Sequence, residues 1–120
     1  MRDPTRGGLA AALNEIAAAS RVCMMIDEKQ LPVRPEVIAA CDIMGFDPIT
    51  VPNEGKMVVI CPASVAELVL GAMKRSPLGR EARIIGDVVG KPEGRVILRT
   101  RTGGQRIVDL PYGEQLPRIC

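Results

Sequence analysis

The heptapeptide EQLPRIC, residues 114–120, ends the sequence on a cysteine. A thiol on a chain end can reach a site elsewhere on the protein, which a cysteine buried in a core cannot do. In an extended segment, residues two apart point to the same side, so Arg118 and Cys120 could share one face. Nearby positive charge favours the nucleophilic thiolate, although the adjacent chain-end carboxylate opposes it. Gln115 and Leu116 could help to dock such a tail. From these residues alone, a carrier thiol and an accident of truncation explain Cys120 equally well.

A second candidate site is DPTRGG, residues 3–8, which precedes an alanine-rich helical pattern. Glycines at a helix start let a ligand or another backbone approach closely, and the N–H groups there attract anions. Arg6 adds a planar cation that suits phosphate or carboxylate. Two interpretations stay open: Gly7 and Gly8 serve close packing beneath a helix cap, or they form an anion site together with Arg6.

A third candidate is Asn53-Glu54-Gly55, in a proline-flanked loop directly before an apolar segment. Loops at strand ends often present functional groups on a rigid scaffold. The Glu54 carboxylate could act as a general base if its pKa suited the reaction. The alternative is a solvated loop acid beside a turn glycine.

The other cysteines, Cys23, Cys41 and Cys61, lie in apolar segments. We expect them to be small buried hydrophobic residues. Their spacing matches no zinc-binding pattern and the sequence contains no histidine, so no metal site is predicted.

Composition narrows the class of protein. A chain of 120 residues, 47% apolar and 25% charged, suits one globular domain. A net charge of +2 with interspersed signs, and 2% aromatic residues, gives neither a basic stripe nor a stacking platform, so nucleic-acid binding is not expected. No apolar run approaches the roughly 20 residues of a membrane span. Because no secretory signal opens the chain, we expect a cytoplasmic protein without membrane association.

Two helices are expected in the first half of the chain. The first covers about residues 4–20, with Asp3 as its cap and Pro4 at its first position. Its buried face is expected to carry Leu9, Leu13, Ile16 and Ser20. The second covers about residues 35–44 and ends at Gly45. Its apolar face is expected to carry Val37, Cys41 and Met44.

A third helix is expected after Ser64, because Ser64 and Glu67 form a capping-box pattern. Its core-facing residues are expected to be Val65, Leu68, Val69, Ala72 and Met73.

Strands are expected at residues 22–27 and 56–61, and then in a run at 82–90, 94–101 and 105–110. KPEG and TGG supply the turns that join the last three as hairpins. Gly86-Asp87 and Gly103-Gly104 are therefore assigned to structure. Helices mixed with strands and followed by hairpins favour an α+β domain, a mixed β-sheet with helices packed on it, over residues 1–110. The prolines of residues 111–120 favour a flexible C-terminal tail outside that domain.

Five stretches occur here in one order: RDPTRGGLAAALNEIA, NEG, IIGDVVG, TGG and QLPRIC. In this combination the sequence resembles the C-terminal domain of the hydrogenase maturation factors of the HypE family, from Arg2 to Cys120. The terminal PRIC is the specific part of the resemblance. The RDPTRGG-type helix start is shared with the superfamily of aminoimidazole ribonucleotide synthetase and selenophosphate synthetase. The resemblance implies the fold of the C-terminal domain of aminoimidazole ribonucleotide synthetase.

The resemblance also implies a reaction. Cys120 would accept a carbamoyl group from the carbamoyltransferase HypF, and ATP would drive its dehydration to a thiocyanate. The cyanide would pass to iron held by the HypC–HypD complex, for the [NiFe]-hydrogenase active site. By position, Glu54 matches the carboxylate proposed to take a proton from the carbamoyl nitrogen.

Lesser roles follow for the remaining candidates. Arg6, Gly7, Gly8 and Asn53 would form a phosphate site or a wall of the active site. Arg118 would support the tail.

The family's N-terminal domain, which carries most of the ATP and Mg²⁺ site and forms the homodimer, has no counterpart in this sequence. We therefore expect the chain alone to hold no ATP or Mg²⁺ and to be inactive in dehydration. One alternative is a domain of another ATP-using superfamily member, acting in selenophosphate or thiamine-phosphate chemistry. Another is a docking module for maturation partners.

Overall fold

The structure is a computed structural model that describes residues 7–51 and 56–109. Within these residues the helices are α1 (Gly8–Ser20), α2 (Pro35–Met44) and α3 (Ala66–Lys74). The strands are β1 (Cys23–Asp27), β2 (Gly86–Val89), β3 (Arg95–Arg99) and β4 (Gln105–Ile107). Short 3₁₀ turns join them, among them η2 (Pro48–Thr50), η3 (Ala63–Val65) and η4 (Pro77–Gly79).

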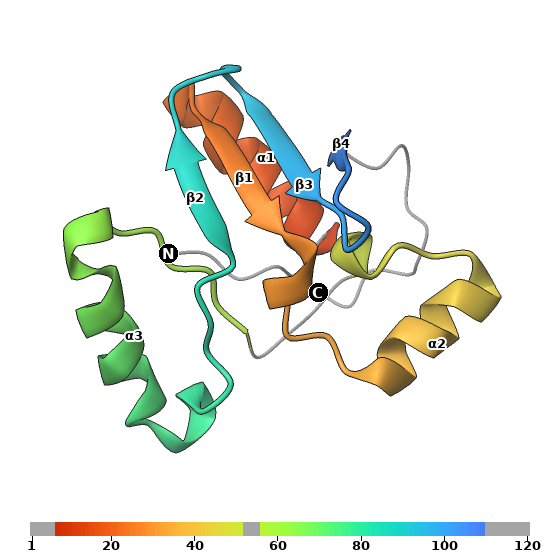
Figure 1. The fold of residues 1–120 in the computed structure, drawn as a ribbon, viewed down its shortest axis with the longest axis horizontal. Helices are drawn as coiled ribbons and strands as arrows, with labels where there is room; N and C mark the ends of the chain where they lie inside the picture. The colour runs from red at the N-terminus through yellow and green to blue at the C-terminus, as the bar shows by residue number, and fades with distance from the viewer. Residues whose placement is uncertain (1–6, 52–55, 110–120) are drawn as a thin grey trace.

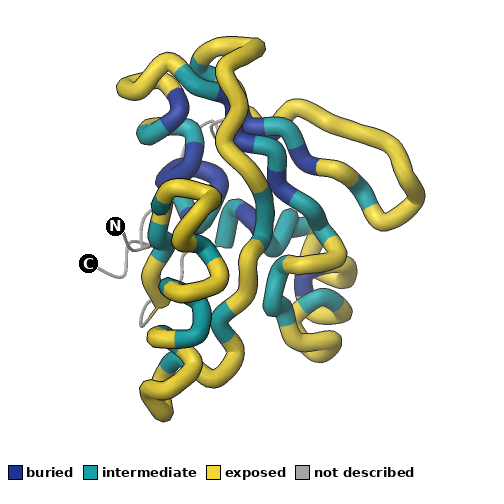
Figure 2. The backbone as a smooth tube through the Cα atoms, turned by 60° about the vertical axis from the view of Figure 1, so that its left-hand side comes forward, coloured by how far each residue is buried: buried dark blue, intermediate teal, exposed yellow. Residues whose placement is uncertain are grey.

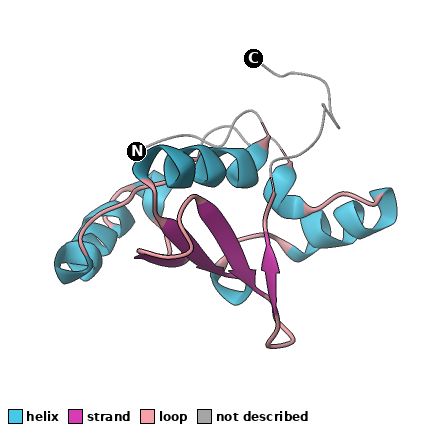
Figure 3. Ribbon diagram, turned by 90° about the horizontal axis from the view of Figure 1, so that it is seen from above, coloured by secondary structure: helices cyan, strands magenta, loops and turns pink. Residues whose placement is uncertain are grey.

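The strands form one mixed sheet in the order β2-β1-β3-β4. Strand β1 runs parallel to β3 and antiparallel to β2, so that Met24 pairs with Val96 on one side and Val88 on the other. Helix α1 lies across one face of this sheet (Figure 3). Helices α2 and α3 stand at opposite sides of it (Figure 1). The predicted α+β class with a mixed sheet is confirmed.

The core lies between α1 and the two central strands (Figure 2). It is formed by Ala10, Leu13 and Ala17 of α1, Met24 and Ile26 of β1, Val96 and Leu98 of β3, and Ile49 and Val108. Leu13 of the predicted face is buried, and alanines form the rest of the buried face, so that the helix lies close to the strands. Leu9 and Ile16 pack only at the margin of the core, and Ser20 is exposed.

The boundaries of α2 agree with the prediction. The helix ends at Gly45, whose φ of 73° is left-handed and suits a residue without a side chain. Helix α1 begins at Gly8 rather than Pro4, because Gly7 at φ 71° departs from helical geometry. Gly7 occupies the cap position, and the predicted cap, Asp3, lies outside the described residues.

Helix α3 is also capped differently from the prediction. It begins after a 3₁₀ turn and has Val65 rather than Ser64 at its cap position. None of its residues is buried, so the expected core face is wrong. Among the described elements, α3 lies nearest to the 3₁₀ turns η3 and η4 that flank it in the sequence.

Four of the five predicted strands are present, each shorter than expected. Residues 56–61 form no strand in the structure and carry only an isolated bridge at Val58. The apolar run predicted burial, yet Met57 is 55% exposed, and Val58 packs only at the margin of the core.

Of the two predicted hairpin turns, TGG is confirmed and KPEG is wrong. TGG closes a hairpin between β3 and β4, with Gly103 at φ 94° and the Thr100 N–H donating to the Gly104 carbonyl at 2.8 Å. KPEG does not close a hairpin, because β1 lies between β2 and β3. Gly86 is structural as predicted: a Cβ there would come within 2.0 Å of the Met25 carbonyl oxygen.

Neither of two further features is present in the part of the chain that the structure describes. No helix there is both long and apolar enough to cross a membrane. No group of three or more acidic, cysteine or histidine side chains gathers there in a way that could hold a metal ion.

Candidate functional site

The N-terminal end of α1 is formed by two glycines, Gly7 and Gly8. Gly7 occupies the cap position in a left-handed conformation and forms no side-chain cap hydrogen bond. Its carbonyl accepts from the Ala11 N–H at 3.3 Å, which closes the first turn. No acidic residue lies in that turn. The end therefore has the backbone donors and positive helix dipole that favour an anion.

Gly8 brings this helix end into direct backbone contact with η2. The residue is buried, and a Cβ on it would lie 2.6 Å from the Val51 carbonyl oxygen and 2.8 Å from that of Ile49. Only glycine allows such an approach, and its φ of 65° adds a second requirement. Gly8 therefore serves close packing, as one of the two predicted interpretations stated. The same contact leaves Gly7 beside the segment that continues into Asn53 and Glu54.

Asp47 organises η2 from one end. Its Oδ1 accepts from the Ile49 N–H at 3.2 Å, and its carbonyl accepts from the Thr50 hydroxyl at 2.8 Å. Its other carboxylate oxygen, Oδ2, accepts from the Arg106 guanidinium of β4 at 2.6 Å. One side chain thus fixes both the turn below Gly8 and the last strand of the sheet.

Asn14 makes the matching connection from α1. Its side-chain amide donates to the Ala10 carbonyl one turn earlier and to the Val108 carbonyl, both at 2.9 Å. The Val108 N–H donates to the Val96 carbonyl at 2.8 Å. The residues just before the tail are therefore attached to both the helix and the sheet.

Through these contacts, three stretches of the chain attach to the described structure near one half of α1. Residues 1–6 lead into Gly7, the segment 52–55 follows Val51, and the tail follows Asp109. Gly8 contacts Val51, and Asn14 holds Val108. The structure thus brings together the attachment points of the three stretches that the sequence singled out.

Some of the predicted site residues lie in the part of the chain that the structure describes, and others do not. Gly7 and Gly8 are in place at the start of α1. Arg6, Asn53, Glu54, Arg118 and Cys120 lie outside the described residues, as do the domain boundary at 110 and the tail at 111–120. Their roles stay predictions.

The remaining cysteines were predicted to be small buried hydrophobic residues, and this is confirmed only in part. Cys23 and Cys41 are buried, and burial raises the pKa of the Cys23 thiol above its ordinary value. Such a thiol is a weak nucleophile at neutral pH. Cys61 is only half-buried, because its segment forms no strand.

Sequence reasoning missed Asp47 and Asn14. The signal for Asp47 was present: Asp followed by proline is the usual start of a helical turn, here within FDPIT. The signal for Asn14 was a polar residue in the middle of an alanine-rich helix, where asparagine is unfavourable unless its amide has a partner.

The chain is similar to a known domain family and to curated proteins that contain it. The family model described as AIR synthase related protein, C-terminal domain, matches residues 1–99. The chain is 56% identical over 120 residues to a carbamoyl dehydratase HypE of Cupriavidus necator, and 55% identical to one of Rhizobium leguminosarum. Both matches cover 100% of this chain but 34% of the relative. The chain thus spans about a third of the curated relatives it matches.

Solved structures give the same result. A crystal structure of the hydrogenase maturation protein HypE superimposes with a TM-score of 0.92 and 43% identity, over 99% of this chain and 39% of that chain. HypE in complex with ATP gives 0.90 and 42%, over 99% and 37%. The HypE–HypF complex gives 0.85 and 44%, over 92% and 35%. The resemblance predicted from the sequence is confirmed.

Proposed function

Because the chain belongs to the family of AIR synthase related C-terminal domains, we propose that it is the cysteine-carrying domain of a HypE-type carbamoyl dehydratase. The observation that carries the proposal is similarity to such dehydratases over all 120 residues, through the terminal PRIC. Its biological role is then in [NiFe]-hydrogenase maturation, in the cytoplasm. The remaining two-thirds of such a protein forms the homodimer and holds most of the ATP and Mg²⁺.

The first step is carbamoyl transfer to the tail. The Cys120 sulfur bonds to the carbonyl carbon of a carbamoyl group on the carbamoyltransferase HypF, and the donor's leaving group departs. Cysteine suits this step because its thiolate is strongly nucleophilic near neutral pH. Arg118 favours the thiolate through its positive charge. The HypE–HypF complex among the similar structures supports HypF as the partner.

The second step converts the S-carbamoyl group to a thiocyanate. Bound ATP supplies the phosphoryl group that makes the amide oxygen a leaving group. Glu54 takes protons from the amide nitrogen as the carbon–nitrogen triple bond forms and the oxygen departs with phosphate. The cyanide is then delivered to iron on the HypC–HypD complex.

The glycine-rich start of α1 suits the phosphate in this step. Gly7 supplies backbone without a side chain, and Arg6 precedes it directly. An anion that develops there is stabilised by the N–H groups of the first turn and by the guanidinium. Because Gly8 contacts Val51, a tail that reaches Glu54 also reaches this helix end. The similarity to HypE with ATP supports nucleotide binding in the whole protein.

The test is intact mass with peptide mapping after incubation with HypF, carbamoyl phosphate and ATP. We expect a carbamoyl adduct on Cys120 in this chain and in a full-length protein that contains it, with loss of water only in the full-length protein. Cys120→Ala should abolish the adduct, while the matched Cys61→Ala should keep it. An adduct on Cys61, or none on either protein, would refute the carrier role.

The same samples distinguish the carrier from the alternative function, a docking module that binds HypF. A docking module would bind HypF equally well with and without Cys120. If Cys120→Ala kept HypF binding and modification persisted elsewhere in the chain, the protein would be a docking module and not a carrier.

A further inference from the structure

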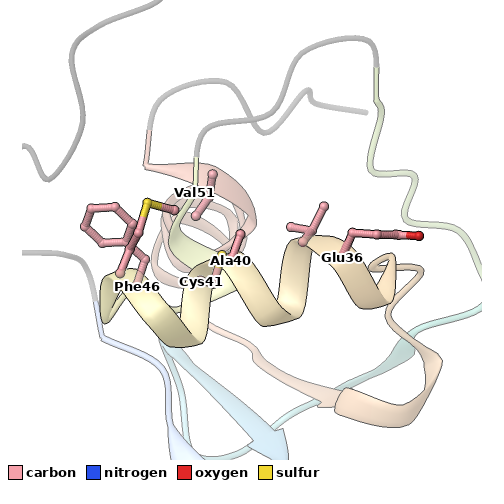
Figure 4. A pocket seen from close by; sticks show the side chains of 7 residues that line it. Glu36, Ala40, Cys41, Phe46 and Val51 are labelled. Atoms are coloured by element: carbon pink, nitrogen blue, oxygen red, sulfur yellow. The ribbon is translucent and has the colours of Figure 1, made fainter.

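Helix α2 borders an apolar groove that the functional proposal does not use. The groove has a volume of about 280 Å³ and lies between α2 and the chain around η2. It is lined by Glu36, Val37, Ala40, Cys41, Met44, Phe46 and Val51 (Figure 4). We call it the α2 groove. Its volume lies below the roughly 300–1,000 Å³ of drug-sized ligand sites, so it suits one or two aliphatic side chains better than a nucleotide.

The groove consists of the apolar face that the sequence predicted for α2. That face does not enter the main core: Cys41 is the only buried residue of the helix. Val37 is 43% exposed and Met44 is 58% exposed. Open apolar side chains around a cavity indicate a surface on which another segment packs.

Strand β4, the last strand before the tail in the sequence, is joined to the chain beside this groove. Arg106 of β4 is bonded to Asp47, and Asp47 follows the groove residue Phe46 in the chain. Asn14 holds the Val108 carbonyl, so the last described residues before the tail are attached to α1. In Figure 1, β4 lies on the same side of the sheet as α2.

The tail is also long enough. Residues 110–120 can span at most about 40 Å when extended. Helix α2 has 10 residues and is therefore about 15 Å long. The extended length of residues 110–120 therefore exceeds the length of the helix that borders the groove.

The chemistry of the tail complements the groove. Its sequence supplies two aliphatic residues, Leu116 and Ile119, and one cation between them, Arg118. Pro117 favours the polyproline II conformation, in which residues three apart lie on one face. Leu116 and Ile119 can then enter together. Glu36, the exposed acid of the groove, lies in the first turn of α2, where Arg118 can pair with it.

We infer that the α2 groove is the docking site of this chain's own tail, with Leu116 and Ile119 in the groove and Arg118 beside Glu36. Cys120 then follows directly after a docked residue and stays at the surface, open to a partner that modifies it. The meaning of this presentation rests on the proposed function, but the docking does not. Tail binding is measured without carbamoyl chemistry, so the two ideas fail separately.

The experiment attaches a nitroxide to Cys120 in the Cys61→Ser background, in a chain with ¹³C-labelled methionine and valine methyl groups. We expect the Met44 and Val37 methyl signals to be lost and to return when ascorbate reduces the nitroxide. The Met73 methyl of α3 should be unaffected. If the Met44 and Val37 signals persist, the groove does not hold the tail and the inference is wrong.

Two further samples decide the cause of any broadening. Met44→Glu places a charge in the groove and should preserve the Val37 signal, whereas Leu78→Glu, at a 99% exposed position on η4, should leave the broadening intact. Spin-labelled chains without isotope are then mixed with isotope-labelled chains that carry Cys120→Ser. Loss of the Met44 and Val37 signals in this mixture would show that the tail of a second copy occupies the groove, which would overturn the inference.

Discussion

The side-chain amide of Asn14 donates to the Val108 carbonyl at 2.9 Å, across 94 residues of sequence. The same amide donates to the Ala10 carbonyl within α1. One side chain therefore joins the helix that forms the candidate anion site to the last residues before the tail. Both acceptors are backbone groups, so the connection depends on the amide itself.

Asn14→Ala should lower the free energy of unfolding by about 1 kcal/mol. The lost hydrogen bonds leave a partly buried carbonyl at Val108 without its partner, which costs roughly 1–3 kcal/mol, and the higher helix propensity of alanine offsets part of this. Urea unfolding measures the change. Ser20→Ala, at the exposed end of the same helix, is the control and should not destabilise the chain. Equal stability of Asn14→Ala and the parent chain would show that the amide does not hold Val108.

Gly8→Ala should be more destabilising than Gly45→Ala. Both glycines have a left-handed φ, 65° and 73°, which costs an alanine roughly 1 kcal/mol or more. A Cβ at Gly8 would also lie 2.6 Å from the Val51 carbonyl oxygen, whereas one at Gly45 meets nothing within 4 Å. We expect a loss of about 1 kcal/mol for Gly45→Ala and roughly 2–4 kcal/mol for Gly8→Ala.

Thermal or urea unfolding of the two alanine variants tests this difference. Gly71→Ala, inside α3 with open space around it, should instead stabilise the chain by up to about 1 kcal/mol. Similar losses at Gly8 and Gly45 would mean that α1 does not press against η2.

The glycines also show how far sequence reasoning reached. Local rules located Gly45 as the end of α2 and Gly103 as a hairpin turn, because each glycine serves its own turn. Gly8 was left between packing and anion binding, since the sequence cannot show that Val51 lies against it. Contacts between segments distant in sequence decide such cases, and the Asn14–Val108 bond was missed for the same reason.

Amphipathic patterns predicted where the helices lie in the sequence better than they predicted which segments those helices pack against. The residues of α2 were placed correctly, but their apolar face borders a groove rather than the core. Leu68 of α3 is likewise 69% exposed. A pattern shows that a face avoids water, but which segment covers it depends on the tertiary arrangement. The roles of Glu54 and Cys120 follow from the resemblance to a family and not from the pattern, and because both residues lie outside the described part of the chain, they stay predictions.

Cys23 should make stability depend on pH in the alkaline range. Burial raises the pKa of its thiol in the folded chain, so above the ordinary thiol pKa of about 8.5 the unfolded chain releases a proton first. Its contribution is therefore undiminished below that pH and is lost as pH rises through the folded pKa. The free energy of unfolding, measured in urea from pH 7 to 10, should fall less steeply in Cys23→Ala than in the parent chain.

Because every other titrating group is common to the two proteins, the difference between the curves isolates Cys23. Parallel curves for Cys23→Ala and the parent chain would contradict the raised pKa.

Glu54→Gln should separate the two chemical steps in a full-length protein that contains this chain. Glutamine keeps the size and hydrogen-bonding ability of the side chain but cannot take a proton from the carbamoyl nitrogen. Carbamoyl transfer to Cys120 should proceed at the parent rate, since it needs only the thiol and HypF. Conversion to the thiocyanate should fall by roughly 10²–10⁴-fold, the usual contribution of a general base.

Mass spectrometry follows both steps in one sample, because the carbamoyl and cyano adducts differ by one water. Glu67→Gln, an exposed acid in the first turn of α3, is the matched control and should dehydrate at the parent rate. If Glu54→Gln lost carbamoylation as well, the NEG loop would serve tail binding or HypF recognition. Full dehydration by Glu54→Gln would assign the base to another residue, and the contact of Gly8 with Val51 would then serve packing alone.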